Sequence, residues 1–168
     1  LRSGSSRVRV TAPDGTAARI ATASGDIAVT VATGRTEIST ASGDVRVAVA
    51  ASLQVKTASG DIVVDRVTSD VAAKTASGDI NAQAVGGTLD ATTASGDIRV
   101  ATVGGALRVN TASGDVRIGR FEGTTLQANT VSGDVSVGIP TGRSIDLDVK
   151  TLSGAVRLPE RRGTAAEP

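Results

Sequence analysis

The chain has 168 residues, enough for one domain with a sizeable core, and its only aromatic residue is Phe121. It contains no His or Cys, which excludes disulfides and removes the usual catalytic bases, thiol nucleophiles and zinc ligands. Eighteen Lys and Arg against 17 Asp and Glu leave a net charge of +1, without the basic excess of a nucleic-acid or anionic-membrane binder.

No run of about 18 or more apolar residues is present, so we expect no membrane insertion. No signal peptide is recognisable, and the chain begins at Leu1 rather than Met. These features predict an excised or mature fragment.

Residues 1–15 contain a half-copy of a repeat, Val8-Arg9-Val10, which predicts a partial N-terminal coil. Arg2, Arg7 and Arg9 would then charge an exposed sheet edge, a common guard against end-to-end aggregation.

The full repeat follows, with Ser-Gly-Asp at its centre. Copies begin at Ser24, Ser42, Ser59, Ser77, Ser95, Ser113 and Ser132, and a Ser-Gly-Ala copy begins at Ser153. The spacings are 18, 17, 18, 18, 18, 19 and 21 residues. A fixed period of this length is typical of solenoids, in which stacked coils bury a continuous core.

Each copy predicts three short sides and three corners. In the copy around Ser113, Leu107, Val109 and Thr111 share one parity, as in a strand with one buried face. The alternation of apolar and polar residues shifts by one position at Ser-Gly-Asp. This shift predicts a corner where Gly bends the chain and Asp and Ser bond to nearby main chain. The alternation shifts again at Gly119-Arg120, and glycines such as Gly104-Gly105 mark the third corner.

The predicted fold is therefore all-β: a single-stranded, three-sided parallel β-helix (β-solenoid) with about 18 residues per coil. We expect it to be right-handed, as parallel crossovers generally are. The β-solenoid would span residues 1–158, and residues 159–168 would form a polar, disordered C-terminal tail.

The tandem copies resemble the bacterial adhesin-like β-strand-repeat family of unknown function, the type called domain of unknown function 4097. The closest copies are 57–64, 93–100 and 111–118, and the resemblance covers about residues 18–158. It implies a single-stranded β-helix from a bacterium and carries over no catalytic residue. The family's less regular N-terminal part is missing, which agrees with a fragment.

Stacking turns the repeated aspartates into a ladder: Asp26, Asp44, Asp61, Asp79, Asp97, Asp115 and Asp134. Neighbouring carboxylates would repel by up to about 1 kcal/mol per pair in water. We expect each Asp to bond main-chain N–H at its own corner, helped by Arg46, Arg99 and Arg117 two residues beyond their aspartates. The alternative is calcium held between rungs, although the repeat lacks the glycine-rich pattern of known calcium β-rolls.

A second ladder consists of threonines: Thr22, Thr40, Thr57, Thr75, Thr93, Thr111, Thr130 and Thr151. On an outer face such an array would suggest ice binding. Its parity instead predicts a buried ladder, in which the Thr and Ser hydroxyls bond to one another and to corner backbone.

These observations favour a non-enzymatic structural or interaction module without a cofactor. It would present a rigid, repetitive surface to an unknown protein, to the cell envelope or to itself, with end-to-end self-assembly as a specific version. The alternative is a ligand-binding solenoid that uses the Asp ladder for calcium or the Thr ladder for ice. We expect neither nucleic-acid binding nor membrane insertion, and a cell-surface or secreted location rather than a cytoplasmic one.

Overall fold

The computed structural model describes residues 2–5, 7–11, 16–30, 33–140, 142 and 144–158. This part of the chain contains strands and no helix. The first strands are β1 (Arg2–Ser5), β2 (Val8–Val10), β3 (Ala18–Ser24), β4 (Ile27–Val29), β5 (Thr33–Ser42), β6 (Val45–Ser59), β7 (Ile62–Val67), β8 (Val71–Ser77) and β9 (Ile80–Val85). The remainder are β10 (Leu89–Ser95), β11 (Ile98–Val103), β12 (Leu107–Ser113), β13 (Val116–Phe121), β14 (Thr125–Ser132), β15 (Val135–Val137), β16 (Asp146–Ser153) and β17 (Val156–Arg157).

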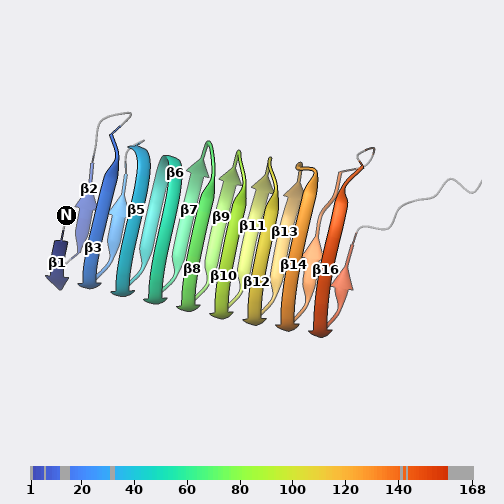
Figure 1. Cartoon of the computed structure of the whole chain (residues 1–168). Helices are drawn as coiled ribbons and strands as arrows, with labels where there is room; N and C mark the ends of the chain where they lie inside the picture. Colours follow the sequence, from blue (N-terminus) through green and yellow to red (C-terminus); the bar gives the residue numbers. More distant parts are fainter. Residues whose placement is uncertain are drawn as a thin grey trace, which may run out of the picture.

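The strands stack as a parallel β-solenoid of about eight turns with roughly 18 residues per turn. Each strand pairs with its equivalent in the next coil in strict register; Leu107 of β12, for example, pairs with Leu89 of β10 and Leu126 of β14. Figure 1 shows the strands side by side along a rod, with the N-terminus at one end and β16 at the other. The predicted all-β parallel solenoid and its period are confirmed.

The Ser-Gly-Asp corner depends on glycine for two reasons. Its glycines, such as Gly96 and Gly114, have φ between 120° and 144°, a region that side chains resist. A Cβ added at Gly96 would also overlap the carbonyl oxygen of Gly78, the equivalent residue one coil earlier. The same overlap recurs at each Ser-Gly corner from Gly43 to Gly154, so the stack itself requires glycine in this column.

The second predicted corner lies inside a strand. In β13, Ile118 and Phe121 are buried while Gly119 and Arg120 between them are exposed. The ladder to β11 skips the same place, pairing Ile118 with Val100 and then Arg120 with Thr102. The strand therefore bends without ending, and each regular coil contributes two strands rather than three.

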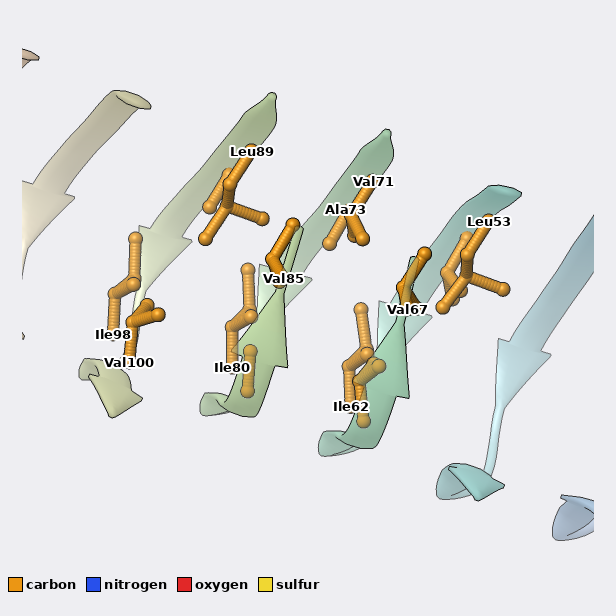
Figure 2. Close-up of a cluster of buried hydrophobic side chains, with 14 of the residues drawn as sticks. Leu53, Ile62, Val67, Val71, Ala73, Ile80, Val85, Leu89, Ile98 and Val100 are labelled. Atoms are coloured by element: carbon orange, nitrogen blue, oxygen red, sulfur yellow. The ribbon is translucent and has the colours of Figure 1, made fainter. Parts of the chain in front are cut away.

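The core consists of columns of identical or similar apolar side chains. Figure 2 shows Leu53, Val71 and Leu89 in one column and Ile62, Ile80 and Ile98 in another, all of them buried. Phe121 is fully buried in a third column, in which the smaller Val67, Val85 and Val103 precede it. A Cβ at Gly123 would lie 2.8 Å from the Phe121 Cζ, so this glycine makes room for the ring.

The C-terminal end of the described rod is apolar and open. β16 pairs with β14 on one side and with no described strand on the other. The exposed large hydrophobic side chains among the described residues gather here: Val131, Leu152, Val156 and Leu158. The tail predicted for 159–168 lies outside the described residues, as do parts of the predicted N-terminal coil.

Candidate functional site

The aspartate ladder links successive coils. The main-chain N–H of each corner aspartate donates to Oδ1 of the aspartate one coil earlier, as from Asp115 to Asp97 at 2.9 Å and from Asp97 to Asp79 at 2.8 Å. The same bond joins every rung from Asp26 to Asp134, with N···O distances of 2.8–3.3 Å. The prediction that each aspartate bonds at its own corner was wrong: the side chain reaches the next corner along the rod.

Arginines pair with the second carboxylate oxygen. Arg99 lies 2.6 Å from Asp97 Oδ2 and 3.2 Å from Asp79 Oδ2, and Arg117 likewise contacts Asp115 at 2.7 Å and Asp97 at 3.6 Å. The Asp134 main-chain N–H, and after it Arg117, hold the pKa of Asp115 below its ordinary value against the opposing effect of burial. These ion pairs are partly exposed, so they relieve carboxylate repulsion more than they stabilise the fold.

The ladder has a direction, so its imperfect copy still takes part in it. The N–H of Ala155 donates to Asp134 Oδ1 at 2.9 Å, so the Ser-Gly-Ala corner keeps the bond that it receives. It lacks only the carboxylate that would bind a following coil, and no described coil follows. At the other end Arg7 occupies the aspartate position and lies 3.7 Å from Asp26 Oδ2.

Calcium has no assembled site among the described residues. No group of three or more carboxylates there is arranged to hold a metal ion, whereas calcium takes six to eight oxygen ligands. In each of the seven ladder aspartates Oδ1 already accepts a main-chain N–H. The geometry assigns this ladder to holding coils together, and the calcium alternative stays a prediction to be tested.

The threonine ladder faces inward, as its parity predicted. The seven threonines from Thr22 to Thr130 are buried, and Thr151 in the last coil is half-buried. Most of their hydroxyls donate to the carbonyl oxygen of the Ser two residues on, as Thr93 does to Ser95 at 3.2 Å. Thr111 differs, because its buried Oγ1 has no hydrogen-bond partner.

The prediction that ladder hydroxyls bond to corner backbone is confirmed for most of the threonines. The prediction that the serines are buried with them was wrong. The serines that follow are mostly exposed, together with the alanines beside them, because the chain turns at this corner. With the threonines inside, an ice surface would meet this Ala and Ser column instead of the Thr ladder.

One hollow on the described surface has a polar lining. It lies where Ala72 stands between the longer Gln54 and Asp90, and Arg35 and Asp70 also line it. It contains no base paired with a nucleophile, and Asp70 Oδ1 there accepts the Thr88 main-chain N–H at 2.8 Å. This second inter-coil carboxylate bond was not expected from the sequence, because it occurs in one copy only.

Comparison with known proteins identifies the family. Within the described part of the chain no helix is long and apolar enough to cross a membrane. No curated protein and no solved structure gave a significant match. The family model for Toastrack DUF4097, a domain of unknown function, matches twice, over residues 1–90 and 52–167. The two matches overlap, as expected when interchangeable repeats fit one model in more than one register. The chain belongs to the Toastrack DUF4097 family.

Proposed function

We propose that this chain is a non-enzymatic structural module, a rigid rod that presents its side surface to a partner and its end to another copy. One observation carries the proposal: the repeated polar residues are used to join coils and to hold their corners. The ladder aspartates bind the neighbouring coil, and most ladder threonines bind their own corner. These aspartates and threonines would otherwise suggest a repeated binding or catalytic site, but they are part of the scaffold.

Recognition of a partner then belongs to the outward positions that vary between coils. At one such column the successive residues are Ala48, Asp65, Gln83, Ala101 and Gly119. Regular coils keep these side chains about 4.8 Å apart along the rod, so their sequence forms a fixed linear pattern. A cell-surface or secreted location, with an envelope component or another protein as partner, is part of this proposal.

End-to-end assembly is the finer version of the proposal. The open edge of β16 leaves main-chain groups without a described strand partner, and the nearby hydrophobic side chains of Leu152, Val156 and Leu158 are exposed. Long apolar edges of this kind pair readily with another chain. Sedimentation velocity at increasing concentration tests this version: association is expected, and a strictly monomeric species throughout would contradict it.

The rigid-module core of the proposal has its own test. Small-angle X-ray scattering should show a rod about 40 Å long, which is eight coils at 4.8 Å. Asp65→Ala and Arg66→Ala, both at exposed outer positions, should leave the scattering curve and melting temperature unchanged. A compact or flexible particle, or large destabilisation by these two changes, would contradict a rod whose variable surface is free for binding.

A further inference from the structure

The two ends of the rod differ in the residues that their edge strands carry. The C-terminal edge is the eight-residue β16, in which Leu147 and Val149 pack against the core but are only half-buried. The N-terminal edge is the four-residue β1, whose sequence is Arg-Ser-Gly-Ser. The C-terminal edge strand thus carries partly uncovered apolar side chains, which the sequence of β1 lacks.

The repeat chemistry also opposes stacking one rod's first coil on another rod's last coil. Val8 pairs with Ile27, so Arg7 stands where later copies have Asp. The preceding coil would also have to supply a carboxylate, and its corner residue would be Ala155.

We propose that two copies associate through their C-terminal ends, with β16 of one copy pairing antiparallel to β16 of the other. The inference rests on the proposed end-to-end assembly and specifies its contact. The two-fold axis passes through Val149, which then faces its own equivalent. A self-complementary contact of this kind needs an apolar patch at one end of the rod only.

Charge selects this register over its neighbours. Centring the pair on Val149 sets Asp148 of each copy across from Lys150 of the other, and opposite charges across strands stabilise a sheet. A shift by one residue would turn the inward face outward. Of the shifts that keep the faces, the one centred on 150 would set Lys150 against Lys150. The one centred on 148 would set Asp148 against Asp148, with Asp146 facing Lys150, and so adds a like-charge pair that the proposed register lacks.

The burial of apolar side chains also supports the proposed contact. Leu147 and Val149 pack against the core but are only partly buried, because no coil covers them. Under the proposed two-fold the half-buried faces of both β16 strands point to the same side and extend one core. The competing cover within this chain is residues 159–168, Pro-Glu-Arg-Arg-Gly-Thr-Ala-Ala-Glu-Pro, which offer no large apolar side chain.

A charge swap tests the contact. Lys150→Asp and Asp148→Lys, each made alone in the full chain, set like charges across the axis and should raise the dimer dissociation constant about tenfold or more. Mixed in equal amounts, the two variants restore both opposite-charge pairs and should dimerise again. Lys74→Asp and Asp90→Lys lie in the same two columns at mid-rod and serve as matched controls, which should dimerise like the parent.

A cysteine variant gives an independent measurement if a swapped chain folds poorly. The chain has no Cys, so Val149→Cys can form a disulfide only between copies. Directly opposed residues of an antiparallel pair are close enough for that bond, and oxidation should yield a covalent dimer. Lys74→Cys, treated identically, should remain monomeric under denaturing conditions.

Three results separate the possibilities. Loss and rescue of dimerisation by the charge swap, or a specific Val149→Cys dimer, supports the contact. Association that ignores the charge swap and gives no Val149→Cys dimer overturns this contact and leaves end-to-end assembly standing. A parent chain that stays monomeric at every concentration overturns both, and the scattering test of the rigid module is unaffected.

Discussion

Oδ1 of Asp97 accepts the main-chain N–H of Asp115 at 2.9 Å, although the two residues are 18 positions apart in the chain. Every such bond joins one coil to the next, so the column of carboxylates that would repel one another becomes a series of cross-links. Repetition of Ser-Gly-Asp is thereby explained by stacking. An aspartate is useful wherever another coil follows, and Ala155 stands where none is described.

Removing one rung should weaken the joint between two coils. Asp97→Ala loses the bond to the Asp115 N–H and the ion pairs with two neighbouring arginines, and should cost about 1–2 kcal/mol in the free energy of unfolding. Asp97→Asn keeps an acceptor oxygen and should cost about half as much. Urea unfolding measures both, with Asp65→Ala at an exposed outer position as the control. Equal losses for Ala and Asn would mean that the inter-coil bond contributes nothing.

Glycine in the corner column is required by space as well as by φ. Gly96→Ala would place a Cβ against the Gly78 carbonyl oxygen, and we expect a loss of about 2–4 kcal/mol or a chain that does not fold. Gly142 provides the matched control: its φ is 87°, but no atom lies within 4 Å of an added Cβ. Gly142→Ala should therefore show only the smaller cost of backbone strain. Similar melting temperatures for the two variants would contradict the steric argument.

The sequence predicted the parts of the fold that repeat. Parity alone placed Leu107, Val109 and Thr111 inside, and the shift in alternation located the corner at Gly114. What it could not predict was which coil a side chain would bond to. Positions in adjacent coils are equivalent in sequence, so the choice between the bond at Asp97's own corner and the bond to Asp115 depends on the three-dimensional offset between corners.

The serines were mispredicted for a related reason. Ser113 shares the parity of Thr111, but the chain turns at this corner and the alternation of faces stops there. The sequence predicted the polarity of only one of the two ends: Arg7 and Arg9 are exposed at the N-terminal end, as expected. The apolar C-terminal edge was not foreseen, because Leu147 and Val149 continue the buried columns of covered strands, and only the missing neighbour leaves them half-buried.

Acid should weaken the ladder. The pKa of Asp115 is lower in the folded chain than in the unfolded one, chiefly because of the Asp134 N–H. The carboxylate therefore contributes stability that is fully present above the unfolded pKa of about 3.9 and is lost as pH falls through the folded value. The stability gap between the parent and Asp115→Asn should shrink between pH 6 and pH 3 in urea unfolding. A gap of constant size across that range would rule out this linkage.

Calcium should have no effect on stability. The ladder aspartates use Oδ1 for main-chain N–H groups, and arginines such as Arg99 and Arg117 approach Oδ2. Differential scanning calorimetry in millimolar calcium and in excess chelator should give the same melting temperature. A rise with calcium that disappears in Asp97→Ala would instead establish the ladder as a cation site, since a ligand that binds only the folded state raises its stability.

The unpartnered hydroxyl of Thr111 makes its replacement by valine favourable. Thr111 is buried and its Oγ1 has no hydrogen-bond partner, so burying it costs free energy that nothing offsets. Thr111→Val should raise the free energy of unfolding by about 1 kcal/mol, since a methyl group in this apolar column needs no partner. Thr93→Val is the matched comparison one coil earlier: it deletes the bond to the Ser95 carbonyl and should lower stability by about the same amount. If both variants shift the urea midpoint in the same direction, the hydroxyl of Thr111 has a partner in solution, and the difference between these two rungs disappears.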